Sequence, residues 1–335
     1  MTGVTSCRKP PSVTTALPSA ESRSPEVRHE TNPTFHRKLG LLLRALQGLL
    51  KLSEAEGRHA ERWAARLREL GGFPPHPHPA QFDTKAKRAE LRKKVADRGL
   101  EFSGLAADLW SCPIIPVPDH SKWMSTFEQN VEFASDLGID CIRVDSVSPP
   151  DIFAKERIDP ALGWERLLRA FRAAAAKAAD RGIRVVYEFE PGFAFNKPSE
   201  IVRLADEVGH KNFRILFDTS HAHTCAAVGA RQPGEKETLP GGALELLQRL
   251  RGKIGHVHLI DSDNTLHNNE TSTHAPFGQG VLNFDALIPE LLRSGVPTNW
   301  WTIDLCFWPN AWEVTADAKV FLDRMAQKYA AVASA

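Results

Sequence analysis

The fold is set out most clearly by residues 183–218, which read IRVVYEFEPGFAFNKPSEIVRLADEVGHKNFRILFD. Two runs rich in β-branched and aromatic residues, 183–190 and 213–218, are typical of strands. Between them, the apolar residues of 198–208 recur at helical spacing. Two strands that are connected by a helix pair with each other in parallel, because the hairpin turn of an antiparallel pair is too short to contain a helix. This segment therefore predicts a strand–helix–strand unit of a parallel sheet.

The same alternation continues on both sides of this unit. It predicts six strands, each followed by an amphipathic helix, over about 260 residues, which favours a TIM-type (β/α) barrel of the α/β class. The remaining predicted strands are 101–105, 141–147, 254–261 and 300–305. The remaining predicted helices are 84–97, 122–137, 163–181, 242–251, 284–294 and 312–329.

The first 70 residues differ from the rest of the chain. They hold 12 Lys and Arg against 7 Asp and Glu, and they contain no Asp, Ile or Tyr. Residues 1–35 predict a disordered arm. Segments 39–52 and 53–70 predict helices, and the absence of Val, Ile and Tyr between Arg28 and Lys94 argues against a strand there.

We therefore expect two regions, a helical and disordered leader over 1–70 and a barrel domain over 71–335. The barrel then lacks or replaces its first two strands. We take as a hypothesis that residues 1–70 are foreign to the barrel, through a frame shift or a wrong start. A strand within 30–70 that pairs with the strand at 101–105 would contradict it. Open barrel edges are normally avoided, so an inactive, truncated barrel is one alternative.

Composition excludes several classes of protein. The 335 residues hold 42 Lys and Arg against 41 Asp and Glu, which argues against a nucleic-acid partner held by bulk charge. No apolar stretch approaches the roughly 18 residues of a membrane span. The five cysteines are scattered and form no Cys-x-x-Cys pair, which favours a reducing compartment and a cytoplasmic location. The N-terminus has no apolar core of a secretory signal.

Polar side chains end several of the predicted strands. In a parallel barrel these ends meet on one face, where such folds carry their sites. Both Glu188 and Glu190 face one side of their strand, and the residue nearer the strand end is expected to reach the mouth of the barrel. The resulting set suits Mn²⁺, with Mg²⁺ or Co²⁺ as alternatives, because it offers carboxylates and one imidazole without thiolates. The four predicted metal ligands are Glu190, Asp218, His258 and Asp304.

These residues lie in short motifs that resemble a known family. The motifs are Glu190-Pro191, Phe217-Asp218-Thr219-Ser220-His221, Gly255-His256-Val257-His258 and Pro276-Phe277-Gly278-Gln279-Gly280. In order and spacing they are similar to the sugar phosphate isomerase/epimerase superfamily with a xylose isomerase-like barrel, which includes ketose 3-epimerases and inosose isomerases and dehydratases. The resemblance covers about residues 71–330. It implies that Glu190, Asp218 and His258 bind the metal and that His221 binds substrate oxygens. Where the family usually has Glu as fourth ligand, this chain has Asp304.

The resemblance also implies a reaction. A divalent metal ion would hold the carbonyl and an adjacent hydroxyl of a ketose or keto-cyclitol, and proton transfer would pass through an enediolate. Glu190 and Asp304 would be the catalytic acid/base pair. Substrate hydroxyls would contact His221, Asp261 and His274. Trp110 is expected to form part of an apolar wall on which a sugar face stacks.

Three other functions stay open at this point. A metal-dependent lyase or dehydratase, and a subunit that cleaves C-glycosides of oxidised sugars, use similar chemistry. An endonuclease of the apurinic type also resembles the chain, but the strand 101–105 has no His and Ser272 stands where a further Asp is expected. The expected partner is a small sugar, and either a homo-oligomer or a partner subunit is compatible with the sequence.

Overall fold

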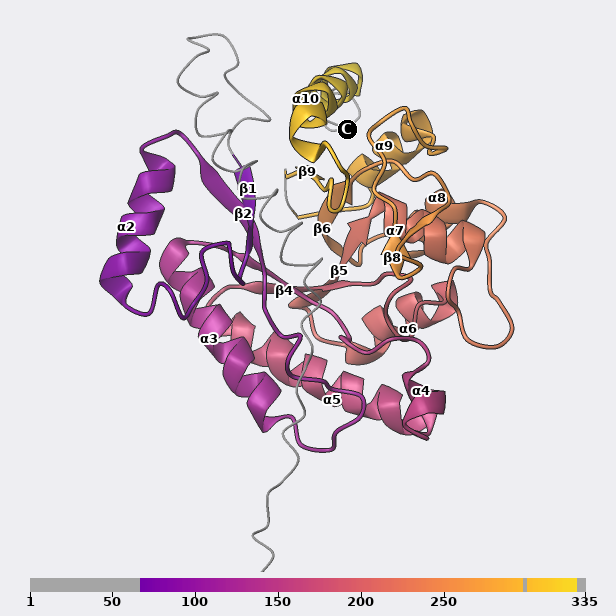
Figure 1. Ribbon diagram of the computed structural model, residues 1–335, viewed down its shortest axis with the longest axis horizontal. Helices are drawn as coiled ribbons and strands as arrows, with labels where there is room; N and C mark the ends of the chain where they lie inside the picture. The colour runs from indigo at the N-terminus through magenta and orange to yellow at the C-terminus, as the bar shows by residue number, and fades with distance from the viewer. Residues whose placement is uncertain (1–66, 298–299, 330–335) are drawn as a thin grey trace, which may run out of the picture.

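The computed structural model describes residues 67–297 and 300–329. Its main feature is a seven-stranded parallel sheet that curls into a nearly closed barrel, with the strands in the order β1-β2-β3-β4-β5-β6-β9 (Figure 1). The predicted TIM-type barrel is thus confirmed. The strands are β1 (Leu67–Gly71), β2 (Glu101–Ala106), β3 (Cys141–Val144), β4 (Arg184–Glu188), β5 (Phe213–Asp218), β6 (Ile254–Leu259) and β9 (Thr302–Ile303).

Helices cover the outside of the barrel and alternate with its strands (Figure 1). A small antiparallel pair, β7 (Leu266–His267) and β8 (Thr271–Ser272), lies in the long loop after β6. The helices are α2 (Lys85–Ala96), α3 (Ser121–Leu137), α4 (Ile152–Lys155), α5 (Pro160–Ala179), α6 (Pro198–Val208), α7 (Thr219–His223), the π-helical turn η1 (Thr224–Val228), α8 (Gly242–Arg249), α9 (Phe284–Arg293) and α10 (Ala311–Lys328).

Strand β1 corrects the analysis of the N-terminal region. It lies where the sequence predicted the end of a helix, and it pairs in parallel with β2 along its whole length. The hypothesis of a foreign segment is therefore wrong for the residues of β1, and the predicted boundary at 70 falls inside this strand. The residues LRELG have a low strand propensity, but the backbone hydrogen bonds that they form with β2 outweigh this low propensity. The disordered arm and the helices predicted before residue 67 lie outside the described residues.

The barrel comes closest to closing between β9 and β1. Strand β9 pairs with β6, and β9 and β1 are in contact without forming a ladder. Among residues 67–297 and 300–329, no strand pairs with the outer edge of β1 or of β9. One of the two strands that the sequence pattern lacked is therefore present as β1. The remaining opening of the barrel lies between β1 and β9.

The core is built from strands that are buried on both faces, as parallel sheets require. All six residues of β6 are buried. Outside the sheet, Phe171 of α5 packs among aromatic rings, with its ring centroid 5.4 Å from that of Phe213 and 5.5 Å from that of Tyr187. The ring of Trp123, on α3, also packs against Phe171, with the centroids 6.2 Å apart. This cluster joins two helices to two strands.

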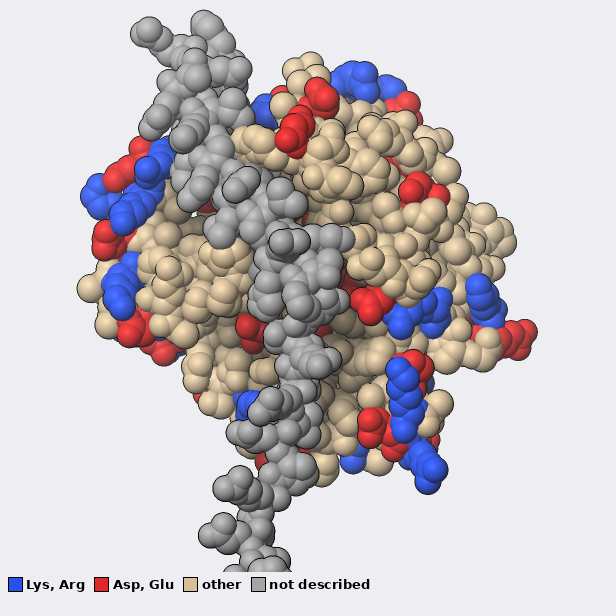
Figure 2. All heavy atoms as spheres, in the orientation of Figure 1, with Lys and Arg blue, Asp and Glu red and all other residues tan. Residues whose placement is uncertain are grey.

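Charged side chains of both signs lie next to each other on the surface. Figure 2 shows blue and red atoms side by side over α2, where Lys87 pairs with Asp83 and Lys93 with Asp97. Such exposed pairs one helical turn apart contribute only about 0.3–0.5 kcal/mol each. No helix within the described part of the chain is long and apolar enough to cross a membrane.

Candidate metal centre

Four acidic and imidazole side chains meet at the carboxyl ends of the barrel strands. Glu188 ends β4, Asp218 ends β5 and His258 lies near the end of β6, directly opposite Asp218 in the ladder. Asp304 follows β9. One ligand atom from each of the four lies within 4.8 Å of every other. Parallel pairing brings these residues together because it aligns all strand ends on one face.

The local structure of Asp218 fixes its carboxylate. Asp218 caps α7, and its Oδ1 accepts hydrogen bonds from the backbone N–H groups of Ser220 and His221, each at 2.8 Å. Its Oδ2 has no hydrogen-bond partner among the described residues. A helix cap thus holds one oxygen and leaves the other directed into the site.

The donor set fits a divalent cation. Glu188 Oε1, Asp218 Oδ2 and His258 Nδ1 are all buried without a hydrogen-bond partner in the described structure. The Nδ1 atom of His258 lies 3.1 Å from Glu188 Oε1 and 3.5 Å from Asp304 Oδ2. Buried polar atoms are nearly always paired, so three orphaned ligand atoms facing one another indicate a place for a cation. The carboxylate and imidazole donors suit Mn²⁺, Mg²⁺ or Zn²⁺.

An arginine keeps Glu188 charged. The guanidinium of Arg143, on β3, is ion-paired with Glu188 Oε2 and lies 3.6 Å from Asp145. Burial alone would raise the pKa of Glu188, but Arg143 and His258 outweigh it and lower the pKa to about 2. Glu188 therefore offers an ionised oxygen at neutral pH. Burial also raises the pKa of Asp145, to about 6.

Carboxylates surround both imidazoles that contact Asp304. Burial would lower the pKa of His258, but Glu69, Asp304 and Glu188 raise it well above its ordinary value. Burial would also lower the pKa of His274, but Cys306, Asp218 and Asp304 raise it well above its ordinary value. In turn, burial would raise the pKa of Asp304, and the two imidazoles hold it well below its usual range. The site thus carries excess negative charge that protons or a cation must balance.

The sequence prediction chose Glu190 as a ligand, and the structure places Glu188 in the four-residue group instead. Strand β4 ends at Glu188, so Glu190 lies two residues beyond the end of the strand. Its Oε2 accepts a hydrogen bond from the hydroxyl of Thr271 and lies 3.7 Å from His221 Nε2. The sequence predicted that the strand runs to residue 190, but β4 ends at Glu188, so the alternation of side chains within the strand does not extend to Glu190.

Two of the predicted substrate-binding histidines lie beside the group. A second cluster of potential ligands consists of Asp218, His221 and His274, all buried. His221 Nδ1 is hydrogen-bonded to Ser272, and His274 Nδ1 donates to the backbone carbonyl of Asp304 at 3.1 Å. His274 Nε2 lies 3.8 Å from Asp218 and has no hydrogen-bond partner in the described structure. Both rings therefore lie beside the four-residue group, and their predicted contact with substrate stays a prediction.

Asp261 takes a different place. It is buried, and its carboxylate accepts hydrogen bonds from backbone N–H groups of the loop 278–282 and from Ser262, at 2.9–3.1 Å. A Cβ at Gly280 would collide with Asp261 Oδ1, so only glycine permits this close approach. Asp261 therefore holds the loop 278–282. Each of its carboxylate oxygens already accepts two backbone hydrogen bonds, which leaves neither oxygen free for the predicted contact with substrate.

Trp110 lies at the same end of the barrel, in the loop after β2. Its ring is stacked on that of Phe73, which follows β1, with centroids 5.5 Å apart, and 40% of its surface is exposed. In the loop after β9, Phe307 is stacked on His267, with centroids 4.6 Å apart. The predicted contact of Trp110 with a sugar stays a prediction.

Sequence reasoning missed one residue of the site altogether. Glu69 of β1 lies against His256 and His258 and forms a third group of potential ligands with them. The strand that carries it has no strand-like pattern, so nothing in the sequence pointed to it. For Glu188 and Arg143 the signal was present, because both are polar residues within otherwise apolar strands.

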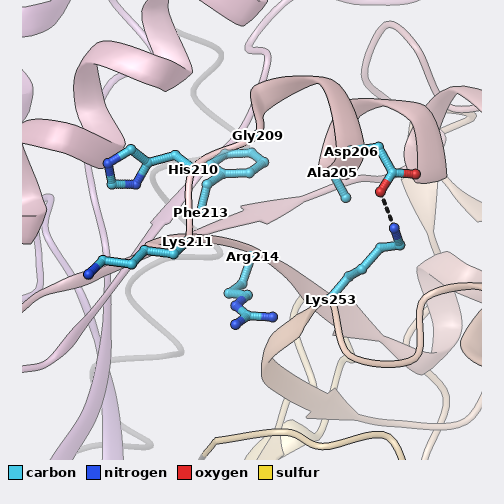
Figure 3. A pocket seen from close by; sticks show the side chains of 8 residues that line it. All are labelled: Ala205, Asp206, Gly209, His210, Lys211, Phe213, Arg214 and Lys253. Atoms are coloured by element: carbon cyan, nitrogen blue, oxygen red, sulfur yellow. Dashed lines mark hydrogen bonds and ion pairs between the residues drawn. The ribbon is translucent and has the colours of Figure 1, made fainter.

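A separate pocket lies at the other end of the barrel (Figure 3). It has a volume of about 300 Å³ and lies where β5 begins and just before β6. Lys253 forms an ion pair with Asp206 across it, and Arg214 donates to the backbone carbonyl of Gly252. The four-residue group lies at the carboxyl ends of the strands and shares no residue with this lining, so the pocket is separate from it.

With this geometry in place, comparison with known proteins identifies the class. Residues 59–322 match the family model of the xylose isomerase-like TIM barrel, and the chain belongs to that family. Among curated proteins it is similar to the inosose dehydratase of Bacillus cereus (strain AH820), with 21% identity over 70% of this chain and 80% of that protein. The inosose dehydratase of Geobacillus thermodenitrificans (strain NG80-2) is 22% identical over 63% of this chain and 72% of its own length.

Solved structures agree on the fold. A xylose isomerase-like TIM barrel protein from Mycobacterium smegmatis in complex with magnesium superposes with a TM-score of 0.61, at 15% identity, over 88% of this chain and 89% of that one. L-ribulose 3-epimerase superposes with a TM-score of 0.59, at 16% identity, over 89% and 92%. The IOLI protein with a bound zinc atom has a TM-score of 0.59, at 17% identity, over 86% and 93%.

Proposed function

We propose that this protein is a divalent-metal-dependent enzyme that moves a proton at the carbon next to the carbonyl of a ketose or keto-cyclitol, as a sugar isomerase or epimerase. The observation that carries this proposal is the convergence of Glu188, Asp218, His258 and Asp304, three of which offer buried, unpartnered ligand atoms within the described structure. A cation held there supplies a Lewis acid for the carbonyl and an adjacent hydroxyl.

The ligand set changes one member of the sequence prediction. We assign Glu188, in place of Glu190, as the ligand from β4, together with Asp218, His258 and Asp304. Arg143 holds one oxygen of Glu188, so that the other faces His258. We propose Mn²⁺ as the resident ion, with Mg²⁺, Zn²⁺ or Co²⁺ as alternatives, on the grounds of the carboxylate-rich donors.

Glu190 then becomes free for proton transfer. It lies just beyond the group, and Thr271 and His221 orient its carboxylate. A carboxylate in this place can accept a proton from the substrate carbon, and Asp304, which lies 3.6 Å from the imidazole of His274, is the proposed second group of the pair. We therefore keep Glu190 and Asp304 as the proposed acid/base pair.

Polar and aromatic side chains around the opening suit a sugar. His221 and His274 offer ring nitrogens for hydroxyl groups beside the metal centre. Trp110 and Phe307 offer partly exposed aromatic faces on which the apolar side of a sugar ring can stack. The four cysteines in the described part of the chain are free thiols, which supports a cytoplasmic location.

A dehydratase is the second candidate, and the curated relatives favour it. Those reported above are named inosose dehydratases. Removal of the same proton can be followed by loss of a neighbouring hydroxyl instead of return of the proton. The two reactions share their first step and differ in the residue that protonates the leaving oxygen. We propose His274 for that role, because its ring lies 3.6 Å from Asp304 and 3.8 Å from Asp218, and Cys306 and these two carboxylates raise its pKa despite its burial.

Deuterium exchange tests the shared first step. In D₂O with Mn²⁺, we expect the protein to replace the hydrogen next to the carbonyl in at least one member of a panel of ketoses and keto-inositols. Glu190→Gln is expected to slow this exchange about 10²–10⁴-fold while the metal stays bound. Mass spectrometry and proton NMR of the recovered sugar measure the exchange and show whether the product is an epimer or has lost water.

The control for this experiment is the same protein after removal of the metal with a chelator. If the metal-loaded protein binds its ion and yet exchanges no hydrogen in any member of the panel, the proposed reaction is wrong.

A further inference from the structure

We propose that Glu69 is a positioning residue that orients the imidazole of His258, so that Nδ1 faces the metal centre and Nε2 carries the proton. This inference rests on the proposed metal centre. Glu69 itself stands outside the group of Glu188, Asp218, His258 and Asp304.

The two nitrogens of His258 face different partners. On one side, Nε2 lies 2.5 Å from Glu69 Oε2. On the other side, Nδ1 lies 3.1 Å from Glu188, 3.5 Å from Asp304 and 3.8 Å from Asp218. The ring therefore stands between one carboxylate on β1 and the three acidic members of the metal centre.

An ionised carboxylate only accepts hydrogen bonds, so the nitrogen that contacts Glu69 must be the one that donates. When Nε2 carries the proton of a neutral imidazole, the lone pair is on Nδ1. Histidines that bind metals commonly donate their other N–H group to a carboxylate, which fixes the tautomer and the ring orientation. Glu69 meets that requirement through a single hydrogen bond.

The backbone around Glu69 is shaped for this contact. The register between β1 and β2 shifts between Arg68 and Glu69, because Arg68 pairs with Phe102 and Glu69 with Gly104. The residue that is skipped is Ser103 of β2, so the irregularity lies in β2 and places Gly104, which has no side chain, opposite Glu69. Across the pair, a Cβ at Gly104 would lie 3.7 Å from the carboxyl carbon of Glu69, which is ordinary van der Waals contact, so the Glu69 carboxylate lies directly beside this glycine.

Glu69 also lies near a second imidazole. The Nε2 atom of His256 is 3.5 Å from the same oxygen of Glu69 and 3.2 Å from the hydroxyl of Thr302. Both rings are buried, and the Glu69 side chain is only 13% exposed. The two imidazoles of β6 thus fix the position of the Glu69 carboxylate. A residue can orient another side chain only if its own position is fixed.

The test measures metal binding, and needs no substrate. By titration of Mn²⁺ into the full chain, we expect Glu69→Ala to bind about 10–100-fold more weakly than wild type. Glu69→Gln keeps an oxygen that can accept from Nε2 and is expected to retain most of the affinity. The matched control is Glu101→Ala on the neighbouring strand β2, whose exposed side chain is remote in the ladder from the metal centre.

A second measurement requires no substitution. In wild-type protein loaded with Zn²⁺ and labelled with ¹⁵N-histidine, NMR should show His258 with Nδ1 bound to the metal and Nε2 protonated. The reverse pattern, or wild-type affinity in folded Glu69→Ala, overturns the role of Glu69. Failure of the proposed reaction is separate, because it would appear as a metal-loaded protein without deuterium exchange.

Discussion

Glu188→Gln is expected to weaken the affinity for Mn²⁺ by about 100-fold or more. Loss of a hydrogen-bond partner of a metal ligand already lowers the affinity for the metal about 10–100-fold. Loss of a ligand itself should lower the affinity by at least the upper value. The variant keeps the size of the side chain and removes the charge that Glu188 presents to His258 and Arg143. Isothermal titration with Mn²⁺, after removal of bound metal, measures the change.

Glu190→Gln is the matched control for this prediction. It lies two residues farther along the chain, and its carboxylate contacts Thr271 and His221 outside the four-residue group. Its metal affinity should stay close to that of wild type. Glu188→Gln also leaves Arg143 buried beside a neutral side chain, so circular dichroism must show that it folds, and Asp218→Asn is the second variant. Equal losses from Glu188→Gln and Glu190→Gln would contradict the assignment.

Phe171→Ala is expected to lower the free energy of unfolding by about 3–5 kcal/mol, a large share of the stability of a typical domain. Phe171 is fully buried and contacts Trp123, Tyr187 and Phe213. The substitution leaves a cavity between α3, α5 and the strands β4 and β5. Urea denaturation followed by tryptophan fluorescence measures the effect.

Leu162→Ala provides the comparison on the same helix. Leu162 lies in the first turn of α5, and 42% of its surface is exposed. Its removal should change the free energy of unfolding by less than about 1 kcal/mol, because little apolar area leaves the core. If the two variants lose the same stability, the packing of α5 against the barrel differs from that described.

Most of the barrel could be predicted because its pattern is local. Strand β5 and helix α6 have the predicted bounds, since apolar runs and amphipathic spacing mark them directly. Strand β1 could not be predicted, because LRELG forms a strand only through pairing with β2, which is distant in sequence. Strand β9 is shorter than predicted, since only Thr302 and Ile303 join the ladder with β6.

The site was predicted in part for a related reason. Asp218, His258 and Asp304 lie at strand ends that the sequence marks, and parallel pairing brings them together. The choice between Glu188 and Glu190 depends on where β4 stops, and element ends are the least certain feature of a sequence pattern. Glu69 acts from a strand without any pattern of its own, so only the structure brings it to His258.

Anomalous diffraction from crystals grown with Mn²⁺ tests the central claim most directly. The account predicts one peak within bonding distance, roughly 2.0–2.3 Å, of Glu188, Asp218, His258 Nδ1 and Asp304. A peak bound by Glu190 instead of Glu188, or an ion held between Glu69 and the two histidines of β6, would contradict it.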